Sequence, residues 1–128
     1  MTKKQTPLKS EDVFTLLVEV KRSKKDGLPV GCSGADILCY TAARTEGEAV
    51  RETVRLLKQA DMNPLDVTGY GTIDERESDG QFLSDKEKGL MAQAKEENSV
   101  IIAQITPYFE NSLKNHENSI PGSRWNFD

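Results

Sequence analysis

The segment YTAARTEGEAV, residues 40–50, decides how the fold is assembled, because a strand pattern changes to a helix pattern within it. Thr45 is followed three residues later by Glu48, directly before a run of apolar residues at helical spacing. In a capping box the threonine hydroxyl accepts a hydrogen bond from the Glu48 amide, and the Glu48 carboxylate accepts one from the Thr45 amide. Glu46 and Glu48 also suit the positive end of the helix dipole. Helix initiation therefore explains most of the polar residues here, and they do not indicate a reactive site.

The elements on either side follow from the same kind of pattern. We expect the first helix over residues 46–60, ended by the Asn63-Pro64 pair, because a residue before proline avoids helical backbone. A second capping box, Ser84 with Glu87, predicts a helix that runs to about residue 97. Alternation of apolar and polar residues predicts strands at residues 13–21, 37–43, 65–73 and 99–109. We expect Pro107 to stop the last of these strands. Between the third strand and the second helix we expect a polar loop.

This order, β-β-α-β-α-β, predicts an α+β fold. Each helix links two strands through a segment long enough for a parallel crossover. We therefore expect a two-layer sandwich related to ferredoxin-like folds, in which a four-stranded mixed sheet carries two helices on one face.

The length of 128 residues fits one domain. We expect a basic arm over residues 1–10, a single domain over residues 11–109, and a polar tail over residues 110–128. Trp125 and Phe127 lie near the end of that tail. Two aromatic residues on a polar segment indicate that it docks, either on its own domain or on a neighbouring chain.

The charge distribution argues against nucleic-acid binding. The net charge is −4, and seven cationic against three acidic side chains give the first 25 residues +4, so the remainder carries −8. An acidic body cannot gather phosphates by counterion release. The first residues lack the apolar segment of a secretory signal, and no apolar run reaches the roughly 20 residues that cross a bilayer. We therefore expect a cytoplasmic protein without a membrane partner, whose two cysteines, Cys32 and Cys39, are reduced.

Residues that could carry catalysis are scarce. The single histidine, His116, lies in the polar tail, so a nucleophile with a histidine base and a histidine-based zinc site are both disfavoured. The acidic segment 75–87 resembles a calcium loop, but Lys86 stands where a bidentate glutamate is required. We predict no catalytic residue, no metal site and no cofactor. Whether the protein is an enzyme stays open, and the sequence favours a protein that is not one.

Two functional hypotheses remain. The first is a non-enzymatic protein-interaction or regulatory module that acts as a homodimer. Its contact surface would be the sheet face without helices, together with the tail aromatics: Leu17, Leu38, Tyr40, Tyr70, Trp125 and Phe127. The second is a small-molecule or anion-binding protein, or a minor enzyme, with its site at the strand ends near Arg44, Gly47 and Arg76.

Overall fold

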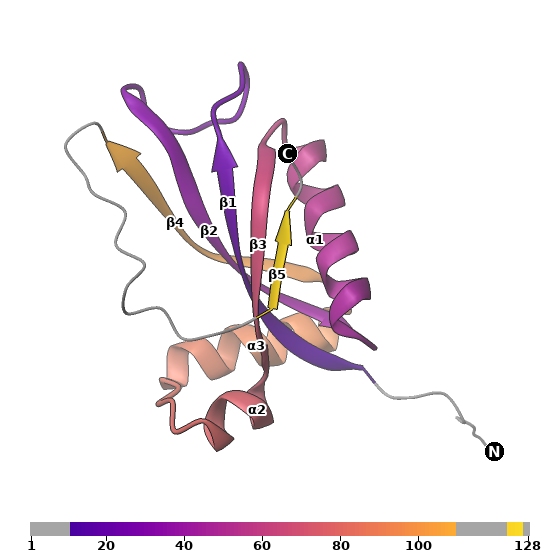
Figure 1. Ribbon diagram of the computed structural model, residues 1–128. Helices are drawn as coiled ribbons and strands as arrows, with labels where there is room; N and C mark the ends of the chain where they lie inside the picture. Colours follow the sequence, from indigo (N-terminus) through magenta and orange to yellow (C-terminus); the bar gives the residue numbers. More distant parts are fainter. Residues whose placement is uncertain (1–10, 110–122, 127–128) are drawn as a thin grey trace.

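The computed structural model describes residues 11–109 and 123–126, which form one sheet and three helices (Figure 1). The α+β class is therefore confirmed. The strands are β1 Asp12–Lys21, β2 Cys32–Ala43, β3 Asn63–Thr72, β4 Val100–Phe109 and β5 Ser123–Asn126. The helices are α1 Glu46–Gln59, α2 Ile73–Ser78 and α3 Asp85–Glu97. The predicted arm, residues 1–10, and most of the predicted tail lie outside the described residues.

The sheet has the order β4-β2-β1-β3-β5, and all four neighbouring pairs are antiparallel. The prediction of a four-stranded mixed sheet was therefore wrong, and the strand order differs from that of ferredoxin-like folds. The reason is the position of β1. Strands β2 and β3 run in the same direction, as their helical connection requires, but β1 lies between them and pairs with both. The fifth strand comes from the predicted tail, where the backbone of Trp125 pairs with Val67 of β3.

Helices cover both faces of the sheet, so the prediction of two helices on one face was also wrong. Helix α1 packs on one face, in a cluster with Leu16 and Val18 of β1. Helix α3 packs on the opposite face, in a cluster with Val13 of β1 and Tyr40 of β2. Neighbouring residues of a strand point to opposite faces. Side chains on both faces of the first half of β1 are buried, so another element must pack on each face of the sheet there.

Local hydrogen bonds fix where the helices begin. The Thr45 hydroxyl accepts from the Glu48 amide at 3.1 Å, as predicted, but the Glu48 carboxylate accepts from the Arg44 amide at 2.7 Å instead of from Thr45. The Ser84–Glu87 capping box is complete. Helix α2 stands where a loop was predicted, and its own capping box joins Thr72 and Glu75. Because α2 has only six residues and buries none of them, its sequence carries no apolar helical pattern.

None of the helices in the described part of the chain is long and apolar enough to cross a membrane.

Candidate functional site

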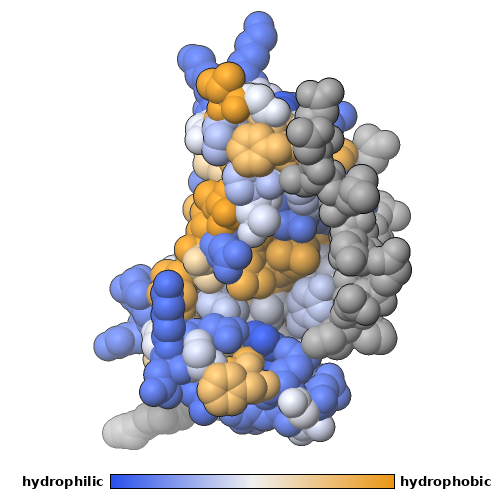
Figure 2. Space-filling view, turned by 90° about the vertical axis from the view of Figure 1, so that its left-hand side faces the viewer, coloured by the Kyte–Doolittle hydropathy of each residue, from blue (hydrophilic) through white to orange (hydrophobic). Residues whose placement is uncertain are grey.

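Strand β4 is an edge strand with an unusual surface. Among the described strands it pairs only with β2. Its ten residues, VIIAQITPYF, include no charged side chain. Three large apolar side chains are substantially exposed: Ile102 at 39%, Ile105 at 42% and Phe109 at 44%. Figure 2, which looks onto this side of the molecule, shows hydrophobic surface gathered along the edge. Native proteins commonly protect sheet edges with charged side chains, especially lysine, which β4 lacks.

The backbone of β4 presents hydrogen-bonding groups on its outer side. The Ala42 amide donates to the Ser99 carbonyl at 3.1 Å, so Ala42 directs its backbone groups toward β4. Backbone groups alternate in direction along a strand, so every second residue of β2 does the same. The residues of β4 that face β2 are therefore the partners of those positions, namely Ile101, Gln104 and Thr106. Tyr108, the partner of Gly34, faces β2 as well. The residues that face outward are Val100, Ile102, Ile105, Pro107 and, at the end of the strand, Phe109.

Pro107 fits this pattern. It lies within β4 opposite Ala35, so the prediction that it stops the strand was wrong. Proline has no N–H, and in the middle of a sheet it would remove a hydrogen bond. Because the Pro107 nitrogen faces away from β2, the existing sheet loses nothing.

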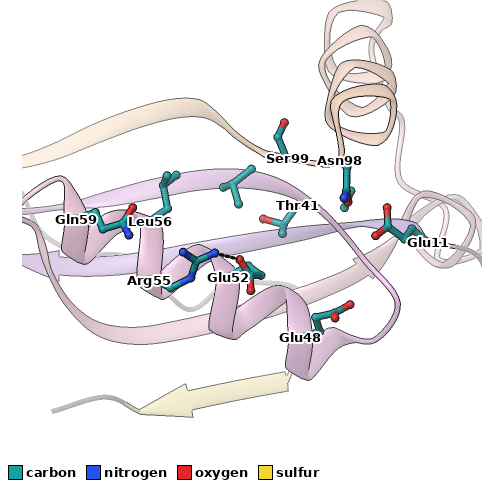
Figure 3. A pocket seen from close by; sticks show the side chains of 11 residues that line it. Glu11, Thr41, Glu48, Glu52, Arg55, Leu56, Gln59, Asn98 and Ser99 are labelled. Atoms are coloured by element: carbon teal, nitrogen blue, oxygen red, sulfur yellow. Dashed lines mark hydrogen bonds and ion pairs between the residues drawn. The ribbon is translucent and has the colours of Figure 1, made fainter.

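A groove of about 470 Å³ lies between α1 and the strands β2 and β4 (Figure 3). Side chains of α1 form one wall, and residues near the start of β4 form the other. The residues that line it are Glu11, Thr41, Ala42, Glu48, Glu52, Arg55, Leu56, Gln59, Asn98, Ser99 and Val100.

Two of the three carboxylates of this groove, those of Glu48 and Glu52, are engaged within the chain. The Arg44 guanidinium lies 3.1 Å from Glu48, and Arg55 pairs with Glu52. The Arg44 amide and then its guanidinium lower the pKa of Glu48. The Thr41 hydroxyl shares a 2.6 Å hydrogen bond with Thr53 beneath the helix. With three carboxylates and one guanidinium along its walls, the groove suits a cationic ligand better than an anion.

The predicted rim residues lie at two different helices, with Arg44 and Gly47 at the start of α1 and Arg76 in α2. Arg44 follows β2 and is paired with Glu48 of α1, and Gly47 lies in the first turn of that helix. Arg76 belongs to α2, where it donates to the Thr15 hydroxyl at 3.1 Å and to the Gln81 side chain at 2.8 Å. A hollow beside Arg44 is also lined by three carboxylates, those of Asp12, Glu46 and Glu75. An anion site at Arg44, Gly47 and Arg76 stays a prediction, and this acidic setting gives it no support.

Tyr40 was predicted on an open face, and that was wrong, because it is fully buried. Its hydroxyl donates to Glu87 of α3 at 3.1 Å, and Arg76 lies 3.5 Å from the same carboxylate oxygen. Burial, and then the hydrogen bond with Glu87, raises the pKa of Tyr40 to about 12. Tyr40, Arg76 and Glu87 therefore join the sheet to α2 and α3.

The other predicted surface residues are distributed differently. Leu17 and Leu38 are half-buried and lie opposite each other on β1 and β2. The next positions on the same face are acidic, because Glu19 pairs with Asp36 and with Asp66. Tyr70 is half-buried, in β3. Phe127 lies outside the described residues, as does the Trp125 side chain. Whether these residues form a contact surface stays a prediction.

Residues 13–109 match the sequence family described as Domain of unknown function (DUF8846). The chain belongs to this family. The DUF8846 match begins in β1 and ends with the last residue of β4, so it includes α1, α2 and α3. No curated protein and no solved structure matches the chain.

Within the DUF8846 region, sequence reasoning missed the edge strand as a candidate site. A signal was present in Pro107, because a proline inside an otherwise apolar strand pattern is typical of an edge strand. The groove beside α1 had no such signal, since its walls come from segments far apart in the sequence, such as Glu11, Leu56 and Ser99.

Proposed function

We propose that this protein is a non-enzymatic interaction module that acts as a homodimer and uses the edge of β4 as its contact surface. The observation that carries this proposal is the combination of an outer strand without charge and three apolar side chains, each more than a third exposed. In strand addition, a second strand satisfies the outward backbone groups, and its side chains cover the exposed apolar ones.

Two features favour the edge over the sheet faces. Tyr40, one of the two tyrosines of the predicted open face, is buried in the cluster beneath α3. The same face carries the part-buried carboxylates of Glu19, Asp36 and Asp66 on neighbouring strands, and two copies packed face to face would bring acidic side chains together there. Two copies of β4 bring no charge together.

The oligomeric state tests this proposal. We expect native mass spectrometry of the wild-type chain at micromolar concentration to give twice the chain mass of 14.3 kDa. Ile105→Lys should give a monomer, because lysine in the contact would bury an unpaired charge. Phe82→Lys is the matched control, since this apolar side chain is 87% exposed and lies between α2 and α3, outside β4. A monomeric wild type, or a dimer that survives Ile105→Lys, would contradict the proposal.

Small-molecule binding is the second candidate, and the volume of the α1 groove favours it. A groove of about 470 Å³ falls within the range of sites that bind small molecules. Its acidic lining favours an organic cation, for which spermidine is a suitable probe, with inorganic phosphate as the anionic comparison. A ligand that binds only the native chain raises the melting temperature by mass action. A rise with spermidine that Glu52→Gln reduces would support the groove. A rise with phosphate that Arg44→Ala removes would instead support the strand-end site, and no rise with either would contradict this candidate.

A further inference from the structure

The direction of each backbone group in β4 defines how two copies can pair. We infer that two β4 strands pair antiparallel about a two-fold axis between Ala103 and Gln104, so that Ile102 lies opposite Ile105 of the partner subunit. This inference rests on the proposed function, because it specifies the geometry of the same contact.

The outward-facing residues of β4 are unevenly spaced. The register of β4 against β2 shifts between the partners of Leu38 and Cys39, so that Leu38 pairs with Gln104 and Cys39 with Ile102. Such a bulge inserts one extra residue, here Ala103, into one strand. It follows that Ile102 and Ile105 both face outward although they are three positions apart. Within residues 100–107 the outward set, Val100, Ile102, Ile105 and Pro107, is symmetric about the point between Ala103 and Gln104.

A two-fold axis determines which residues of the two strands lie opposite each other. In a symmetric pair, a residue before the axis lies opposite the residue equally far beyond it. With the axis between Ala103 and Gln104, every outward-facing residue from Val100 to Pro107 meets another one, and Phe109 lies beyond this paired segment. Ile102 meets Ile105, and Val100 meets Pro107. With the axis at Ile102, Val100 would meet Gln104, whose backbone groups are directed toward β2. Other axes, such as one at Ile101, pair only two of these residues with each other. Only the first register gives all four an outward-facing partner across the contact.

The side chains agree with this register. Ile102 pairs with Cys39 and Ile105 with Ile37 of β2, and both of these belong to the core cluster beneath α1. Ile102 and Ile105 therefore point to the same face of the sheet. Around the axis, two copies of each would form a cluster of four isoleucines. The missing N–H of Pro107 removes one hydrogen bond per chain at the ends of the contact, away from its centre.

A pair of opposite charges can test the register. In the inferred dimer, Ile102→Lys or Ile105→Glu alone places an unpaired charge in the isoleucine cluster and should abolish the dimer. A mixture of the two variants should form a heterodimer, because the introduced lysine lies opposite the introduced glutamate while the other pair remains Ile105 with Ile102. We expect native mass spectrometry to show the heterodimer in at least tenfold excess over either homodimer.

The control is a mixture of Ile102→Lys and Ile102→Glu, which should stay monomeric. If this control mixture forms a dimer, the register is overturned and the edge contact is left intact. The same conclusion follows if neither mixture forms a dimer although the wild type does. A monomeric wild type would overturn both proposals. Circular dichroism establishes that each variant is folded. If a charged variant is not folded, Ile102→Cys mixed with Ile105→Cys replaces it. A disulfide-linked heterodimer, without either linked homodimer, is then the expected result, and linked homodimers would overturn the register.

Discussion

Asp26 shows how one carboxylate organises the long loop between β1 and β2. It is only 4% exposed, and it accepts from the Arg22 side chain at 2.9 Å. It also accepts from the backbone amides of Ser23 at 2.8 Å and of Leu28 at 2.9 Å. Arg22 in turn donates to the Cys32 carbonyl at 3.0 Å, where β2 begins. The loop is therefore held at both ends by one ion pair.

These bonds predict a pH dependence of stability. The hydrogen bond from Arg22, and then the two backbone amides, lower the pKa of Asp26 to about 2. In the unfolded chain an aspartate titrates near pH 3.9. The stabilisation of the fold by ionised Asp26 is therefore complete above about pH 4 and is lost as the pH falls to about 2. We expect the urea midpoint to drop over this interval. In Asp26→Asn the drop should be smaller, and an equal drop in both proteins would contradict this assignment.

Tyr40 gives a second prediction at this scale. Tyr40→Phe removes the hydroxyl that donates to Glu87 and leaves the rest of the buried ring in place. A hydrogen bond to a charged group contributes about 1.5–3 kcal/mol, so we expect the free energy of unfolding to fall by roughly 2 kcal/mol in urea denaturation. Phe82→Ala is the control. Its side chain is 87% exposed, and its removal should change the free energy by less than about 0.5 kcal/mol. If Tyr40→Phe lowers the free energy of unfolding no more than Phe82→Ala does, the Tyr40 hydroxyl contributes nothing to stability.

At the scale of elements, the sequence predicted features that depend on near neighbours. The starts of α1 and α3 were predicted correctly because Thr45 and Ser84 bind amides only three residues away. Arg76 was placed at a strand-end rim, and its partner Thr15, which is 61 residues away, could not be inferred from any local pattern. The prediction that one face of the sheet carries no helix was wrong for a similar reason. Val13 and Thr15 continue the alternation of β1, and nothing near them in sequence indicates that α2 and α3 cover them.

The capping box of α3 can be tested directly. Ser84→Ala removes the hydroxyl that accepts from the Glu87 amide at 3.1 Å. Loss of an N-cap costs about 1 kcal/mol, so urea denaturation should show a decrease of that size. Ser78→Ala, at an exposed position at the end of α2, should change the free energy of unfolding by less than about 0.5 kcal/mol. A silent Ser84→Ala would mean that packing of Met91 and Ala94 alone positions α3.

Pro107 tests the direction of the β4 backbone. Because its nitrogen faces away from β2, Pro107→Ala should leave the stability of the monomeric Ile105→Lys background within about 0.5 kcal/mol. In the otherwise wild-type chain the same change adds an outward N–H donor. We expect a dimer at least as tight as the wild type, measured by sedimentation equilibrium. A weaker dimer would show that the proline nitrogen does not face the contact.

At the scale of the whole molecule, the distribution of charge separates the edge from the rest of the surface. The chain carries a net charge of −4, yet β4 carries none over its ten residues. Two copies joined through β4 would form one continuous antiparallel sheet with both α1 helices on the same face. Attraction between the copies would then come from backbone hydrogen bonds and apolar contact, and their net charges would oppose it at long range.

This balance predicts an unusual response to salt. The screening length falls from about 10 Å at 0.1 M to about 3 Å at 1 M ionic strength, so salt weakens the repulsion between two acidic chains and has no interfacial ion pair to disrupt. We expect the dissociation constant, measured by sedimentation equilibrium, to stay unchanged or to fall by up to about threefold between these two salt concentrations. Phe82→Lys, which lies outside β4, should respond in the same direction. A dimer that dissociates about tenfold more readily in 1 M salt would instead be held by ion pairs, and its contact surface would lie elsewhere than on β4.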